Sequence, residues 1–141
     1  MLRWLIFLFW LSGTIFPYTW LRRESSRFRL LVDTFFGAEW VHVVGHLLLY
    51  ATLACLIWWA LRRRPGWLGS AATLAFAFPV GFMQEGLQSF FRRGAFGGPE
   101  LFDVLVDLTG ALIGLVLARL LFSERKPAGI PRKANRANFP T

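Results

Sequence analysis

Four long apolar segments, separated by short basic clusters, dominate this sequence. A helix rises about 1.5 Å per residue and the hydrocarbon core of a bilayer is about 30 Å thick, so a membrane span needs roughly 20 apolar residues. Segments of this length cover about residues 4–21, 41–61, 67–91 and 101–122. The sequence therefore predicts an all-α integral membrane four-helix bundle, with residues 1–122 as a single domain.

The connectors between these segments have different characters. Ser25 or Ser26 can cap a short helix whose apolar residues recur at helical spacing, namely Phe28, Leu31, Val32, Phe35 and Phe36. We expect this helix to lie on the membrane surface between the first two spans. Residues 62–66 predict a tight basic turn, the glycine-rich segment 92–100 predicts a reversing loop, and residues 123–141 predict a basic disordered tail.

The charge distribution argues for a membrane and against nucleic acid. The formal net charge is +8, but 55% of the residues are hydrophobic and the basic residues sit in clusters between apolar runs. The lipid bilayer is therefore the expected partner, and nucleic acid is not. The single cysteine, Cys55, can form no intramolecular disulfide.

The orientation follows from counting Lys and Arg on each side of four spans. The side of the two termini carries ten, in Arg3, residues 62–64 and residues 119–136. The other side carries six, which are Arg22, Arg23, Arg27, Arg29, Arg92 and Arg93. The positive-inside rule then predicts that both termini lie in the cytoplasm.

Two acidic residues lie within the last apolar segment. The uncharged stretch 108–118 is only about 16 Å long as a helix, too short to cross alone, so Asp103 and Asp107 must belong to the span. Asp107 lies about 9 Å along the helix from Leu101. An ionised carboxylate at that depth costs a few kcal/mol unless it faces protein, water or a partner. We therefore expect Asp107 to take part in a polar network or a functional site.

Three of the predicted spans carry polar stripes that meet at one side of the membrane. The stripes are His42, His46 and Tyr50 on the second span, Glu85, Gln88 and Arg92 on the third, and Asp103, Asp107, Gly110 and Gly114 on the fourth. Residues three or four apart share one helical face. The Gly-x-x-x-Gly spacing of the last stripe favours close packing of another helix. A shared polar cluster is the simplest explanation for this common depth.

These motifs, in this order, resemble the VanZ-like family. The resemblance rests on His46 and Tyr50, then on Glu-x-x-Gln at Glu85 and Gln88, then on Asp-x-x-x-Asp-x-x-Gly-x-x-x-Gly from Asp103 to Gly114. It covers roughly residues 40–122. Asp107 stands where family members often carry asparagine, which adds an acid here. The family is named for a protein associated with resistance to the glycopeptide teicoplanin, so the resemblance implies a multi-pass protein of the bacterial cytoplasmic membrane.

The resemblance leaves three classes of function open. The first is a cell-envelope protein whose polar cluster, in the outer leaflet, binds an anionic lipid headgroup or a lipid-linked wall precursor and affects teicoplanin susceptibility. Its expected site residues are His46, Tyr50, Glu85, Gln88, Arg92, Arg93, Asp103 and Asp107, with no metal or other cofactor. The second is a small membrane enzyme that uses the same cluster as a general acid and base or as ligands for a divalent cation. No recognised catalytic motif accompanies it. The third is a structural or assembly module without a ligand.

Overall fold

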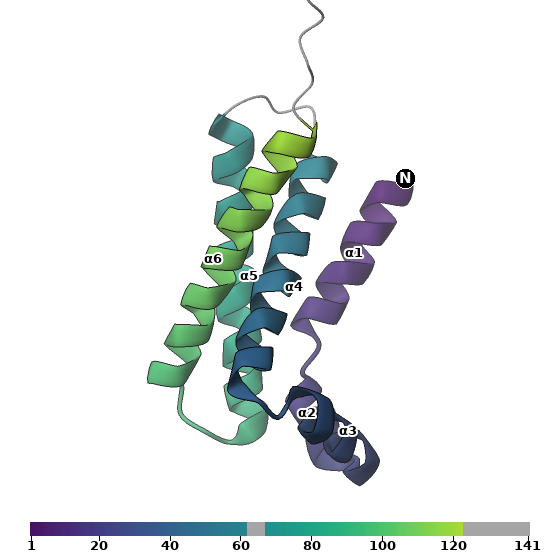
Figure 1. Cartoon of the computed structure of the whole chain (residues 1–141), viewed down its shortest axis with the longest axis vertical. Coiled ribbons are helices and arrows are strands. Elements are labelled where there is room, and N and C mark those ends of the chain that lie inside the picture. Colours follow the sequence, from purple (N-terminus) through teal and green to yellow (C-terminus); the bar gives the residue numbers. More distant parts are fainter. Residues whose placement is uncertain (62–66, 123–141) are drawn as a thin grey trace, which may run out of the picture.

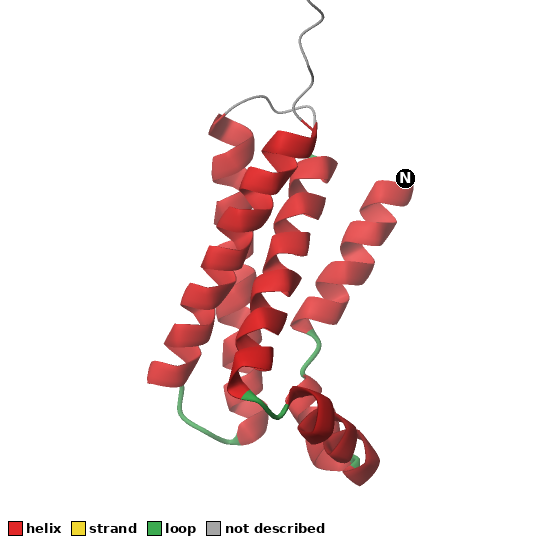
Figure 2. Cartoon of the chain, viewed as in Figure 1, coloured by secondary structure: helices red, strands yellow, loops and turns green. Residues whose placement is uncertain are grey.

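Six helices make up the described part of the chain, which a computed structural model gives for residues 1–61 and 67–122. In chain order they are α1 (Leu2–Ile15), α2 (Tyr18–Glu24), α3 (Ser26–Phe36), α4 (Glu39–Ala60), α5 (Trp67–Arg92) and α6 (Gly98–Phe122). Figure 2 shows only helices and loops over these residues, so the all-α prediction is confirmed. The predicted turn at 62–66 and the predicted tail at 123–141 lie outside the described residues.

The long helices run alongside one another (Figure 1). α4, α5 and α6 pack together, with the α4–α6 contact the most extensive, and α1 lies against α4 and also touches α5. The short helices α2 and α3 lie at one end of the bundle, together with the loop between α5 and α6. The N-terminus and the end of α6 lie at the opposite end. We call the first of these the α2/α3 end.

The first predicted span, about residues 4–21, is divided into two helices. α1 ends at Ile15 and α2 begins at Tyr18, with a bend of 55° between them. Pro17 explains the break, because proline lacks an N–H and disfavours helical backbone at the residue before it. Phe16 is accordingly extended, with φ −60° and ψ 123°. With 14 residues α1 is about 21 Å long and by itself shorter than the hydrocarbon core.

The short helix predicted after Ser25 is present as α3. Ser25 is its N-cap, and the Ser25 hydroxyl oxygen accepts a hydrogen bond of 3.3 Å from the backbone N–H of Phe28. Leu31 and Phe35 are exposed on α3 and leave apolar side chains without a partner in the described chain. That exposure is consistent with a helix lying on a membrane surface, which stays a prediction.

Two helices of the described chain, α4 and α6, are long and apolar enough to cross a membrane, and the bent pair α1–α2 is a third if it forms one span. α5 has 26 residues but does not qualify on composition. Pro79, Gln84 and Glu85 are among the residues that lower its mean hydropathy. Length and composition thus support two or three spans, and the predicted four-span bundle is not confirmed.

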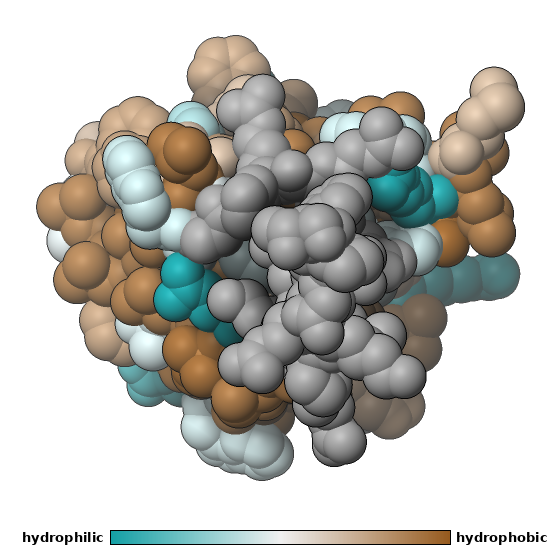
Figure 3. Space-filling model, turned by 90° about the horizontal axis from the view of Figure 1, so that it is seen from above, coloured by the Kyte–Doolittle hydropathy of each residue, from teal (hydrophilic) through white to brown (hydrophobic). Residues whose placement is uncertain are grey.

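Apolar side chains cover the outside of the bundle. Large hydrophobic residues are exposed on each long helix, including Leu48 on α4, Phe82 on α5 and Leu120 on α6. Figure 3, which views the end that carries the N-terminus, shows hydrophobic residues around much of the rim. So many exposed large apolar side chains are characteristic of a protein whose surroundings are lipid.

The α4–α6 contact depends on two glycines of α6. A Cβ atom at Gly110 would lie 2.6 Å from the carbonyl oxygen of Leu47, and one at Gly114 would overlap the backbone of Ala51. The thiol of Cys55 donates a hydrogen bond of 3.1 Å to the carbonyl oxygen of Gly114, which also requires the two backbones to lie close together. Without side chains at 110 and 114, α6 can therefore pack directly on the backbone of α4.

We predict that Gly114→Ala destabilises the bundle by about 1–3 kcal/mol, the usual cost of forcing an extra methyl group into a filled contact. The free energy of unfolding, measured in detergent micelles by titration with a denaturing detergent, checks this. Gly86→Ala is the matched control, because a Cβ at Gly86 meets nothing within 4 Å. Equal stability of the two variants would contradict the proposed role of close packing.

Candidate functional site

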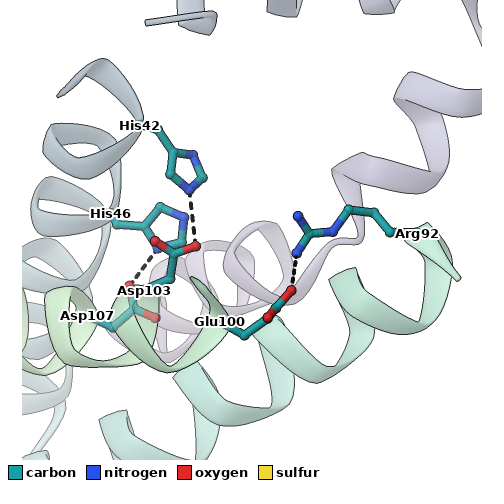
Figure 4. Close-up of polar contacts among 6 residues, drawn as sticks. All are labelled: His42, His46, Arg92, Glu100, Asp103 and Asp107. Atoms are coloured by element: carbon teal, nitrogen blue, oxygen red, sulfur yellow. Dashed lines mark hydrogen bonds and ion pairs between the residues drawn. The ribbon is translucent and has the colours of Figure 1, made fainter. Parts of the chain in front are cut away.

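Two His–Asp pairs connect α4 to α6 (Figure 4). Nδ1 of His46 lies 2.7 Å from Oδ1 of Asp107, and Nε2 of His42 lies 3.3 Å from Oδ2 of Asp103. On each helix the two residues are four positions apart, so one pair lies above the other along the α4–α6 contact. The centroids of the two imidazole rings are 4.4 Å apart. The Gly110–Leu47 contact lies directly beyond the inner pair, so the close approach of the backbones brings these side chains within hydrogen-bond distance.

The inner pair is buried and the outer pair is partly exposed. The His46 and Asp107 side chains are 7% and 2% exposed, whereas those of His42 and Asp103 are 35% and 17% exposed. His46 and Asp107 were among the site residues predicted from the sequence, whereas His42 was not. His42 lies on the same stripe as His46, which is the signal that would have included it in the site.

α5 supplies a third wall of polar residues. The hydroxyl of Tyr50 donates a hydrogen bond of 2.9 Å to Oε1 of Gln84, and Gln84, Glu85 and Gln88 are all buried. Gln84 was missing from the predicted site residues, although its position four residues before Gln88 places it on the same face of α5. Gly81, one turn earlier, leaves room for the inner pair, because a Cβ there would lie 3.0 Å from Oδ2 of Asp107.

Glu85 has no polar partner of its own among the described residues. Its side chain is fully buried, and neither carboxylate oxygen makes a hydrogen bond within the described chain. Oδ2 of Asp107 and Nε2 of Gln88 also lack partners there. Buried polar groups are nearly always hydrogen-bonded, and an unpaired one costs about 1–3 kcal/mol, or more when charged. This group of atoms therefore needs an explanation beyond packing.

Arg92 and Arg93 lie where α5 ends, and neither forms a hydrogen bond with Glu85. Both were predicted as site residues, but the structure pairs Nη2 of Arg92 with Oε1 of the buried Glu100 at 2.9 Å. The other carboxylate oxygen of Glu100 accepts a hydrogen bond of 2.9 Å from the backbone N–H of Gly97. Glu100 thus holds the loop before α6, a role that was not predicted from the sequence. Arg93 is exposed and adopts a positive φ of 57° where the chain leaves α5.

A cavity of about 540 Å³ leads from the α2/α3 end to His46. Its walls come from α2, α3, the start of α4 and the end of α5, and include Tyr18, Arg22, Phe28, Val32, His42, His46 and Arg92. A second hollow of about 460 Å³ shares Arg22 and Arg92 with the first and adds Arg23, Arg29 and Arg93. Asp33 of α3 and Glu39 of α4 also line the first cavity. The cavity therefore combines apolar side chains of α3 with both basic and acidic groups and reaches the polar side chain of His46.

Two groups of three side chains are close enough to hold a cation. His46, Glu85 and Asp107 form one, and His42, His46 and Asp103 form the other, with the ligand atoms of each group within 4.8 Å of one another. All three members of the first group are buried. The arrangement can thus act through proton transfer at the His46–Asp107 pair, through binding of polar ligands or through coordination of an ion.

We predict a larger coupling energy between His46 and Asp107 than between His42 and Asp103, because the inner pair is shorter and better shielded from solvent. A double-mutant cycle with alanine at each position, read out as free energy of unfolding in micelles, should give about 1–3 kcal/mol for the inner pair. The outer pair is the internal control and should give a smaller value. Equal coupling energies, or a larger value for the outer pair, would be inconsistent with this prediction.

Comparison with known proteins identifies the family. A family profile described as VanZ/LLP1 matches residues 2–122, which include every helix of the described chain. No curated protein and no solved structure matches the chain. The family match covers most of the sequence and agrees with the resemblance seen in its motifs. The chain is therefore a membrane protein that belongs to the VanZ/LLP1 family.

Proposed function

We propose that this protein binds a phosphate-bearing headgroup, carried by an anionic membrane lipid or a lipid-linked wall precursor, in the cavity at the α2/α3 end. The observation that carries the proposal is the cavity itself. Arg22 and Arg92 lie at its rim and His46 at its inner limit, while Phe28 and Val32 of α3 line one side. An amphiphile with a charged headgroup and an apolar tail needs this combination of surfaces.

The charge at the α2/α3 end favours phosphate. Six arginines lie there, which are Arg22, Arg23, Arg27, Arg29, Arg92 and Arg93, and all six are exposed. Arg22 is paired with Asp33 and Arg92 with Glu100. Arg22 and Asp33 are both nearly half-exposed, so Arg22 can exchange its carboxylate for a phosphate oxygen at little cost. Glu100 is only 9% exposed, and it keeps the backbone N–H of Gly97 as a partner when Arg92 turns to a phosphate.

In the proposed placement α5 also crosses the membrane, which gives four spans with α1–α2, α4 and α6. Its polar residues face the bundle, since Gln84, Glu85 and Gln88 are buried, whereas Phe78 and Phe82 are exposed. Buried side chains such as Gln84 and Glu85, which face away from lipid, lower the mean hydropathy of α5, as does the exposed Pro79. Its 26 residues correspond to about 39 Å, which exceeds the thickness of the hydrocarbon core.

The same placement locates the cavity in the outer leaflet of the bacterial cytoplasmic membrane, with both termini in the cytoplasm. The count of ten basic residues against six supports this orientation. Labelling of Gly94→Cys by a membrane-impermeant thiol reagent in intact cells, with Cys55 replaced by alanine, tests it. Absence of labelling until the cells are opened would reverse the orientation.

An effect on teicoplanin susceptibility would follow from the proposed ligand. A protein that holds the headgroup of a wall precursor, or changes the local lipid, alters how a glycopeptide reaches its target at the outer face. The proposed effect on teicoplanin susceptibility is supported by the family resemblance and by the proposed location of the cavity.

A membrane enzyme acting on such a headgroup is the second candidate, and the His46–Asp107 contact favours it. A carboxylate 2.7 Å from one ring nitrogen orients an imidazole and increases its basicity, as a general base requires. Turnover of a polyprenyl diphosphate or phospholipid by the purified protein, abolished in Asp107→Asn, would promote this candidate over binding alone.

We predict that Arg92→Gln weakens binding of a phosphate-bearing amphiphile about tenfold, because one charge-assisted hydrogen bond contributes about 1.5–3 kcal/mol when it is formed to a charged group. The protein is placed in phosphatidylcholine nanodiscs, and binding of a polyprenyl diphosphate is compared with that of phosphatidylglycerol. The first probe stands for a wall precursor and the second for a bulk anionic lipid, so the difference between them identifies the source of the headgroup.

Arg119→Gln is the matched control for this experiment. Arg119 lies near the other end of α6, where its guanidinium is 5.8 Å from the Trp58 ring, and it does not line the cavity. Its replacement should leave binding unchanged. Equal losses for both arginine variants would indicate non-specific charge attraction, and failure of both probes to bind wild-type protein would refute the proposed function.

A further inference from the structure

We infer that His46, Glu85 and Asp107 bind one divalent cation inside the bundle. The inference goes beyond headgroup binding and does not depend on it, because the three side chains would take the ion with or without a lipid in the cavity. It also differs from the expectation drawn from the sequence, which was a site without a metal. Only the membrane-enzyme hypothesis assigned these residues as ligands of a divalent cation.

Glu85 is the first reason for the assignment. Its side chain has 0% exposure, and both carboxylate oxygens lack a hydrogen-bond partner among the described residues. Oδ2 of Asp107 also lacks a hydrogen-bond partner among the described residues. The nearby Tyr50 has one hydroxyl proton, and it donates this proton to Gln84. Buried carboxylate oxygens from two residues that lie close together without hydrogen-bond partners are typical of a cation site without its ion.

The charge of the site is the second reason. Glu85 and Asp107 bring two carboxylates into a buried region, and no arginine or lysine of the described chain is buried with them. A protonated His46 would offset only one of the two carboxylates. The other, left uncompensated in a membrane interior, costs several kcal/mol. A divalent cation, together with a neutral imidazole, makes the site electrically neutral.

The geometry is the third reason. The ligand atoms of the three residues all lie within 4.8 Å of one another, which is only slightly more than two metal–ligand bonds of about 2.0–2.2 Å laid end to end. Small rotations of the side chains therefore bring all three atoms into contact with a single ion. Each ligand comes from a different helix, so binding would also tie α4, α5 and α6 together.

The ligand set selects the kind of ion. One imidazole nitrogen and two carboxylate oxygens suit Zn²⁺ or Mn²⁺, whereas Ca²⁺ and Mg²⁺ prefer oxygen ligands only. Three protein ligands leave at least one coordination position open. Because His46 also lines the cavity, that position is close to the space where a phosphate oxygen would enter.

The second group of possible ligands fits an ion less well. His42 and Asp103 already bond to each other and are more exposed than the inner residues. No atom of either residue is both buried and without a partner in the described chain. The polar atoms of His42 and Asp103 therefore have a hydrogen-bond partner or access to solvent, whereas Glu85 and Asp107 hold buried oxygens with neither.

The test uses full-length protein in detergent, stripped with EDTA and then equilibrated with Mn²⁺ or Zn²⁺. Elemental analysis after gel filtration should give one ion per chain, and calorimetric titration gives the affinity. Glu85→Gln should lower that affinity at least ~10-fold, since loss of even an outer partner of a metal ligand costs about that much. Asp103→Asn and Glu100→Gln are the matched controls and should retain wild-type affinity.

Electron spin-echo measurements on Mn²⁺ bound to the wild type keep the inference testable if Glu85→Gln does not fold. A nitrogen coupling that changes when histidine is labelled with ¹⁵N, and that persists in His42→Gln, assigns the ligand to His46. Absence of saturable binding of both ions would overturn the inference. So would a site that depends on Asp103 and not on Glu85.

Discussion

The close approach of α4 and α6 is the contact on which the rest of this structure depends. Gly110 and Gly114 let α6 lie directly on the backbone of Leu47 and Ala51, at a distance no other residue would allow. One turn before Gly110, the same approach places Asp107 against His46. The packing motif and the polar site therefore adjoin each other on one face of α6. α5 then closes the site from the third side with Glu85, and Pro17 turns the chain so that α2 and α3 lie over its entrance.

Burial of so many polar groups is energetically unfavourable, and this sets the site apart from a packing network. Tyr50 and Gln84 are hydrogen-bonded to each other, and each His–Asp pair shares one hydrogen bond, although Oδ2 of Asp107 has no partner among the described residues. Glu85 does not fit that description, because it is fully buried with both oxygens unpaired among the described residues. A chain selected only for stability would carry an apolar residue of similar size at this position. A binding partner that enters from the cavity, or an ion held between the helices, offsets the cost.

Much of this fold could be predicted from the sequence, because apolar length and helical spacing are local signals. The bounds of α4, α5 and α6 fall within a few residues of the predicted segments, and Ser25 caps α3 as expected. The break at Pro17 was not predicted within the segment 4–21, because the effect of a proline in a span depends on whether neighbouring helices hold the two halves in line. The stripes on three helices identified most residues that the structure brings together. The partners within the polar cluster were harder to predict than its members. Arg92 forms an ion pair with Glu100, whose other oxygen is held by the backbone N–H of Gly97, and this loop geometry cannot be inferred from sequence spacing.

The most direct measurement compares the free energy of unfolding of wild type and Glu85→Gln, both free of metal and in the same detergent. Glu85 has no hydrogen-bond partner within the described part of the chain, and we propose that it is kept for something it binds. We therefore expect the metal-free variant to be at least as stable as wild type, because a neutral amide is easier to bury than an unpaired carboxylate. A loss of about 1–3 kcal/mol in the variant would show that Glu85 already makes a stabilising contact within the protein. The cluster would then be a structural network, and its proposed binding role would be wrong.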